Sequence, residues 1–209
     1  MYQCPNAQVD DQAKLLGLIH AHPFATVLTV QDGVPTADHI PLVAEIDAQS
    51  GRVALIGHVA RVNPLWRATT ALAVFHGPHA YISADWYAEP NTVPTWNYLA
   101  VHARGPLVVI DDDAGVSAAL DRLAERMEPA ATWRAGLAPE VAAGFRTAIV
   151  AFRIVVEDLR GLAKLSTHHP VARRQRTIAA LRTSGQPDGP AIADAMAATL
   201  EERPQPPQD

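Results

Sequence analysis

Residues 24–33, FATVLTVQDG, decide the fold class of this chain. The first seven of them are apolar or β-branched, which is typical of a strand. The Asp32-Gly33 pair that follows is a strong signal for a hairpin. A second strand is expected over residues 36–46. Because a tight turn joins antiparallel neighbours, this stretch predicts an antiparallel sheet.

Other segments extend this pattern in both directions. Further strands are expected over residues 52–58, 71–83, 95–110 and 149–156, with glycine-proline breaks at 77–78 and 105–106. Helices are expected after Asp10 or Asp11, after the carboxylates at 111–113, near 139–147, and twice beyond 171. The sequence therefore predicts a β-rich α+β fold: a six-stranded antiparallel barrel with peripheral and C-terminal helices.

Composition limits the class of protein further. The chain has 209 residues, a net charge of −5, and Cys4 as its sole cysteine. No apolar run is long enough for a membrane span, and no secretory signal is visible. We expect a cytoplasmic protein without disulfides. The histidine spacing fits no established zinc pattern, so no metal site is expected.

Residues 57–64, GHVARVNP, are the strongest candidate for ligand chemistry. A strand ends there and a helix begins, and free N–H groups at a helix start favour an anion. His58 and Arg61 can add charge-assisted hydrogen bonds to phosphate oxygens. The alternative is that Asn63 only caps the helix and Arg61 is a surface residue.

Two other regions allow a functional and a structural interpretation. The aromatic and amide side chains of residues 75–83 and 94–98 suit a planar heterocycle, or they simply pack in the core. Residues 159–187 contain basic but no acidic side chains, which suits a solvated helix face or a phosphate contact. No nucleophile elbow, dinucleotide fingerprint or P-loop is present.

Several motifs together resemble the PaiB family of FMN-binding negative transcriptional regulators, in the flavin split-barrel superfamily. They are Met1-Tyr2 with Pro5, then residues 22–26, 37–42, 57–64, 74–83, 93–98, 101–102 and 164–166. The resemblance implies an FMN-binding split barrel over residues 1–183, followed by a C-terminal helix and a Pro-rich tail over 184–209. It also implies a homodimer with the flavin at the subunit interface.

The resemblance assigns cofactor-binding residues as well. They are His39, Ile40, Pro41 and Leu42 beside the flavin, His58, Val59, Ala60 and Arg61 at its phosphate end, and Tyr98, His102, Lys164 and Ser166 along the pocket. No catalytic residue is assigned.

Four alternatives remain open at this stage. The protein is an FMN-dependent oxidoreductase of a small molecule, or a haem-binding or haem-degrading split barrel. It is otherwise a DNA- or partner-binding regulator without redox activity, for which the basic helix around Arg173, Arg174 and Arg176 is the sole candidate contact. A scaffold that has lost its cofactor also fits, because residues 167–169 depart from the family pattern.

Overall fold

The computed structural model describes residues 7–47, 51–128, 130 and 136–201. Within the chain, two compact units can be distinguished. We call one the sheet unit, made of Gln12–Phe75 and Val101–Leu159. The other is the helix unit, made of Met1–Asp11, His76–Ala100 and Arg160–Asp209. Residue 184, where a C-terminal segment was expected to begin, lies inside the helix unit.

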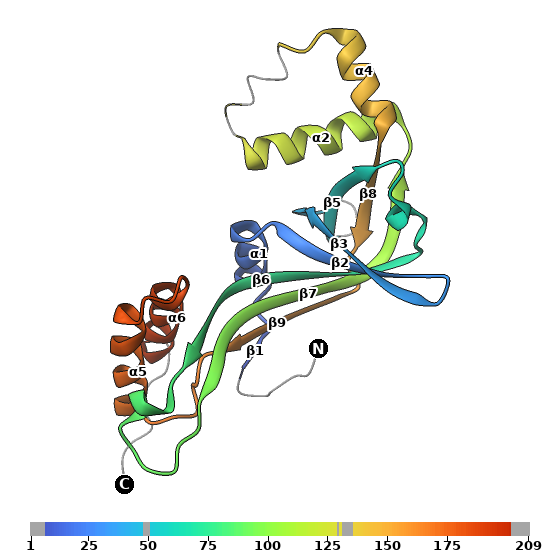
Figure 1. Cartoon of the computed structure of the whole chain (residues 1–209). Coiled ribbons are helices and arrows are strands. Elements are labelled where there is room, and N and C mark those ends of the chain that lie inside the picture. The colour runs from blue at the N-terminus through green and yellow to red at the C-terminus, as the bar shows by residue number, and fades with distance from the viewer. Residues whose placement is uncertain (1–6, 48–50, 129, 131–135, 202–209) are drawn as a thin grey trace. The chain divides into compact units, whose positions relative to one another are not determined.

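Antiparallel strands form the framework (Figure 1). The strands are β1 (Gln8–Val9), β2 (Phe24–Gln31), β3 (Val34–Pro41), β4 (Val43–Ile46), β5 (Val53–Ala60), β6 (Thr70–Ile82), β7 (Thr95–Ile110), β8 (Ile149–Val155) and β9 (Asp158–Lys164). Their hydrogen-bonded order is β3-β2-β6-β7-β8-β5-β4, and β9 pairs with β1 and β7. The predicted antiparallel α+β fold is confirmed.

The strand count predicted from the sequence was too low. The described residues form a sheet of nine strands, whereas six were expected. The expected strand over residues 36–46 is divided at Leu42, because β3 pairs with β2 as far as Pro41 and β4 pairs with β5 from Val43 onward. Two residues of β1 are too few to show a period, and β9 has few β-branched residues.

The two glycine-proline pairs do not interrupt their strands, since β6 and β7 both run through them. Gly105 has a packing reason to be glycine. A Cβ there would lie 1.8 Å from the carbonyl oxygen of Val155, so only a residue without a side chain allows this approach.

Helices α1 (Gln12–Ala21), α2 (Asp113–Met127) and α4 (Pro139–Ala148) belong to the sheet unit. α1 begins after Asp11, as predicted, and buries Leu15 and Ile19. α2 begins where the carboxylate run predicted a cap, because Asp112 Oδ1 accepts from the N–H of Gly115 at 2.7 Å. Its Ala119 packs against Ile56 of β5 and Ala151 of β8, so α2 covers one face of these strands.

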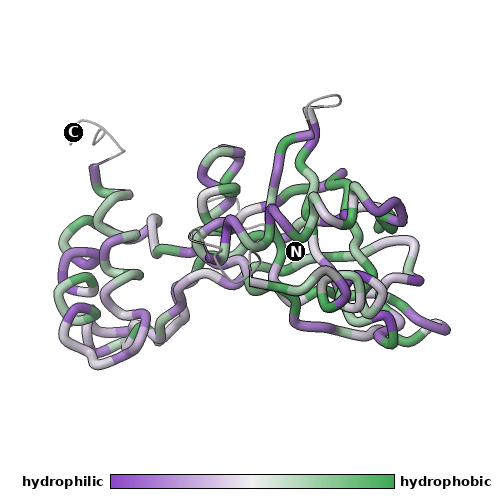
Figure 2. The backbone as a smooth tube through the Cα atoms, turned by 90° about the horizontal axis from the view of Figure 1, so that it is seen from above, coloured by the Kyte–Doolittle hydropathy of each residue, from purple (hydrophilic) through white to green (hydrophobic). Residues whose placement is uncertain are grey.

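In the helix unit, α5 (Val171–Thr183) and α6 (Gly189–Glu201) pack side by side (Figure 1). Ile178, Leu181, Ile192 and Met196 join the helices to Ala80 and Ile82 of β6 in one apolar cluster. Hydrophilic and hydrophobic turns alternate along the helix pair beside the C-terminus (Figure 2). The expected disordered tail, residues 203–209, lies outside the described residues.

Of the helices in the described ranges, none combines the length and the apolar composition that a bilayer crossing requires.

Candidate functional site

The turn after β5 is fixed to the end of α4 by Arg61. Its Nε donates to the carbonyl of Thr147 and an Nη to that of Ile149, both at 2.8 Å. The Arg61 backbone N–H donates to the carbonyl of Ala148, also at 2.8 Å. The side chain therefore satisfies carbonyls that a helix leaves without intrahelical partners at its C-terminus. A guanidinium carries further N–H groups, so these bonds do not exhaust its donors.

A pocket of about 350 Å³ opens beside Arg61. We call it the arginine pocket. Its residues come from the ends of β7 and β8, from α2 and from α4: Arg61, Val109, Ile110, Asp111, Asp113, Val116, Ala143, Arg146, Thr147, Ile149, Val150 and Ala151. Two guanidinium groups, two carboxylates and an apolar floor thus meet at one cavity. Its size is in the range of small-molecule sites.

His58 lies on the same side of the sheet as part of the arginine pocket. It pairs with Ala151 across β5 and β8, and paired residues of antiparallel strands share a face. Its Nδ1 is buried and has no hydrogen-bond partner within the described part of the chain. Burial lowers the pKa of His58, so the neutral imidazole is favoured. A buried polar atom without a partner indicates a ligand or a water at this position.

The turn after β5 does not provide the helix N-terminus that was expected to bind an anion. The helix there, η1 (Pro64–Arg67), is a four-residue 3₁₀ turn, and the Asn63 side chain accepts from the N–H of Leu65 at 2.8 Å. The backbone N–H groups of Arg61 and Asn63 also have carbonyl partners. Asn63 is therefore a cap, and positive charge for an anion comes from arginine side chains rather than from a helix end.

The residues from His39 to Leu42 do not form one surface. Ile40 and Leu42 are core residues, exposed by 4% and 0%. His39 points to the other face of β3, where its Nδ1 lies 3.3 Å from Thr26 Oγ1 and its ring contacts Phe24. Pro41 ends β3 opposite Phe24. Of these four residues, His39 is the exposed one.

Among the residues predicted at the phosphate end of the flavin, Val59 is buried, and Ala60 is exposed and pairs with Ile149. His102 lies on the part of β7 that belongs to the sheet unit. Of the predicted residues in the sheet unit, His58, Ala60 and Arg61 lie together at the end of β5 and in the turn that follows it.

Three predicted residues lie in the helix unit: Tyr98, Lys164 and Ser166. Lys164 Nζ donates to Thr95 Oγ1 at 2.6 Å. The buried Ser166 donates to Asn97 Oδ1 at 3.0 Å, and Asn97 Nδ2 contacts the sulfur of Met196 at 3.3 Å. Ser166 has a φ of 57°, a left-handed conformation that is uncommon without glycine. The hydroxyl of Ser166 is thus part of a buried internal network.

The arginines of α5 bond partners within the helix unit, and Arg182 is the one whose side chain is mostly exposed. Arg173 and Arg176 both bond the carboxylate of Glu89, and Arg182 pairs with Asp194 at 3.1 Å. Arg174 is 5% exposed and donates to Thr199 Oγ1 and to the carbonyl of Met196. These side chains hold α5 to α6 and to the loop after η2 (Ala84–Tyr87). The DNA contact expected at this helix stays a prediction.

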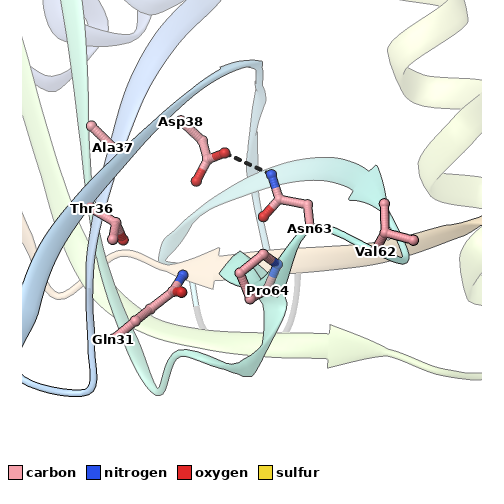
Figure 3. Close-up of a pocket in the computed structure, with 7 residues that line it drawn as sticks. All are labelled: Gln31, Thr36, Ala37, Asp38, Val62, Asn63 and Pro64. Carbon is pink, nitrogen blue, oxygen red and sulfur yellow. Dashed lines mark hydrogen bonds between the residues drawn. The ribbon is translucent and has the colours of Figure 1, made fainter.

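A second, more open pocket of about 350 Å³ lies on the other side of the same turn (Figure 3). We call it the aspartate pocket; it is lined by Gln31, Thr36, Ala37, Asp38, Val62, Asn63 and Pro64. Asn63 Nδ2 donates to Asp38 Oδ1 at 2.6 Å and joins β3 to the turn. Sequence reasoning missed Asp38, although it lies in a quoted motif. It also missed Arg146, which lies 85 positions after Arg61 and which no local pattern marks.

Comparison with known proteins agrees with this architecture. A family model described as "Putative FMN-binding domain" matches residues 1–158. The protease synthase and sporulation protein PAI 2 of Bacillus subtilis is 30% identical over 97% of this chain and 100% of its own. The chain therefore belongs to the family that this model describes, as the resemblance indicated.

Solved structures share the split-barrel fold. The flavocytochrome Anf3 from Azotobacter vinelandii superposes with a TM-score of 0.60 at 18% identity, over 75% of this chain and 68% of its own. The FAD and heme binding protein from Mycobacterium smegmatis gives 0.57 at 22% identity, over 75% and 73%. At these identities the likeness concerns the fold. The homodimer and the regulatory role expected from the resemblance stay predictions.

Proposed function

We propose that this chain binds FMN, with the phosphate end of the cofactor at the arginine pocket. The observation that carries the proposal is that Arg61 and Arg146 line one cavity. His58, whose Nδ1 has no partner among the described residues, pairs with Ala151, which also lines this cavity. Family membership and the split-barrel fold support a flavin as the ligand.

The residues present fit such a group. Guanidinium groups bind phosphate oxygens through paired, charge-assisted hydrogen bonds. The carbonyls of Thr147 and Ile149 hold Arg61 in place, and because carbonyls are neutral they leave its charge uncompensated. Asp111 and Asp113 also line the pocket, so the phosphate belongs at the arginine end, away from these carboxylates. FMN, when bound, supplies redox chemistry that the side chains lack.

His58 would act as a neutral hydrogen-bonding group. Its burial lowers its pKa, so the charge expected from the sequence is not its main contribution at neutral pH. The imidazole can still donate or accept one bond at Nδ1, depending on its tautomer.

The test compares FMN with riboflavin, which lacks the phosphate. Titration of the purified protein, followed by flavin fluorescence, gives both dissociation constants for the wild type and for Arg61→Ala. A charge-assisted hydrogen bond contributes about 1.5–3 kcal/mol, so FMN binding should weaken roughly 10- to 100-fold. Riboflavin binding should change by less than about threefold, since it lacks the group that Arg61 holds.

The paired ligands separate a local from a general effect. If Arg61→Ala weakened FMN and riboflavin equally, Arg61 would act only by holding α4. If the wild type bound neither flavin, the proposal would be wrong.

A further inference from the structure

We propose that the aspartate pocket is a second binding site, which takes a small organic amine in its protonated, cationic form. The site stands on the residues that line it and does not depend on flavin binding.

The pocket is lined by residues of the β2–β3 hairpin and of the turn after β5. In the β2–β3 ladder Asp38 is opposite Val27 and Thr36 is opposite Thr29, and Val27 and Thr29 are buried. The alternation of side chains along β3 therefore turns Asp38 inward, on the face opposite to His39. Val62, Asn63 and Pro64 close the other side.

The charge of the lining excludes anions. Asp38 is the sole charged residue among the seven that line the pocket, and none of the seven is basic. A phosphate or carboxylate here would face the Asp38 carboxylate without a compensating cation. The two pockets thus differ in charge: Arg61 and Arg146 line one together with two aspartates, whereas Asp38 is the one charged residue that lines the other.

Hydrogen-bond geometry favours a donor. Asn63 Nδ2 donates to Asp38 Oδ1 at 2.6 Å, while Asn63 Oδ1 accepts from the N–H of Leu65 at 2.8 Å. Both the nitrogen and the oxygen of the Asn63 side-chain amide are therefore hydrogen-bonded, and the fixed amide orients the Asp38 carboxylate. A carboxylate accepts several hydrogen bonds, and the second oxygen of Asp38 points toward the middle of the labelled residues in Figure 3.

The remaining lining defines the rest of the ligand. The Gln31 amide and the Thr36 hydroxyl, which bonds Thr29 Oγ1 at 2.9 Å, add polar groups, whereas Ala37, Val62 and Pro64 provide apolar surface. An ammonium group carries up to three donors and a positive charge. A short aliphatic amine can pair with the Asp38 carboxylate and also pack against the apolar residues. An alcohol of equal length can make the apolar contact but carries no charge for the carboxylate.

Chemical-shift titration of the full ¹⁵N-labelled chain, without added flavin, tests the proposal. n-Butylamine at pH 7 should shift the backbone amides of Gln31, Asp38, Val62 and Asn63, and n-butanol should bind at least tenfold more weakly. Sodium chloride at matched ionic strength serves as the salt control.

Asp38→Asn keeps an oxygen that can accept from Asn63 but removes the charge. It should weaken n-butylamine at least tenfold. Asp32→Asn, in the exposed turn of the same hairpin, should leave the affinity unchanged. Equal binding of butanol and butylamine, or equal binding by wild type and Asp38→Asn, would overturn the proposal. Because no flavin is present, either result is independent of the Arg61 test.

Discussion

Two groups of arginines show how differently the same side chain is used in this molecule. Arg173, Arg176 and Arg182 of α5 pair with carboxylates inside the helix unit. Arg61, in the sheet unit, bonds carbonyls and lines a pocket. A carboxylate cancels the charge of an arginine, whereas a carbonyl orients the guanidinium without neutralising it. The densest basic run of the sequence is therefore structural, and an isolated arginine is the candidate ligand contact.

The largest effect is expected from a helix-unit arginine, and on stability alone. Arg174→Ala removes bonds to Thr199 and to the carbonyl of Met196 at a site that is 5% exposed. Burying these groups without a partner should lower the free energy of unfolding by about 2–4 kcal/mol, measured by urea denaturation. FMN affinity should stay at the wild-type value.

Arg182→Ala is the matched control on the same helix. Its ion pair with Asp194 is exposed, so the loss should stay below about 1 kcal/mol. If Arg174→Ala were no more destabilising than this control, or if it weakened FMN binding without loss of stability, the contrast between the two groups would fail.

An intermediate effect is expected from the second arginine of the arginine pocket. Arg146→Gln keeps a polar, though shorter, side chain and removes its charge. FMN binding should weaken by about tenfold, which corresponds to about 1.4 kcal/mol, while riboflavin binding and the melting temperature change little. Isothermal titration calorimetry with both ligands measures this. Unchanged FMN affinity would place the phosphate away from α4.

The smallest effect is a pH dependence that His58 contributes to stability. Its folded-state pKa lies below the ordinary value of about 6.5, so the unfolded chain takes up a proton first as the pH falls. Stability is therefore retained above about pH 6.5 and lost as the pH falls below it. His58→Gln should reduce this loss, as measured by urea unfolding at pH 7 and pH 5.

Part of the pH dependence should survive in this variant. Burial, followed by the charges of His168 and Arg173, also lowers the pKa of His169. An unchanged pH profile in His58→Gln would show that Nδ1 is solvated rather than buried without a partner.

Much of the fold could be predicted from local pattern. The hairpin at Asp32-Gly33, the cap at Asp112 and the start of α1 after Asp11 all follow from short-range rules, and the structure has them. β1 and β9 were missed because two residues are too few to show a period and β9 has no β-branched residue. The candidate site was predicted in part: residues 57–64 were selected, but Asp38 and Arg146 were not.

The amino-acid sequence by itself determined the antiparallel α+β fold, the family, and the importance of the turn after β5. Alternation, turn residues and ordered motifs are local properties, so they can be read along the chain. The tertiary structure alone decided which charges are cancelled. Glu89 reaches Arg173 and Arg176 across the helix unit, and Arg146 joins Arg61 at one pocket. Which charges form an ion pair depends on their distance in the folded chain. For residues that are far apart in the sequence, this distance cannot be predicted from their spacing.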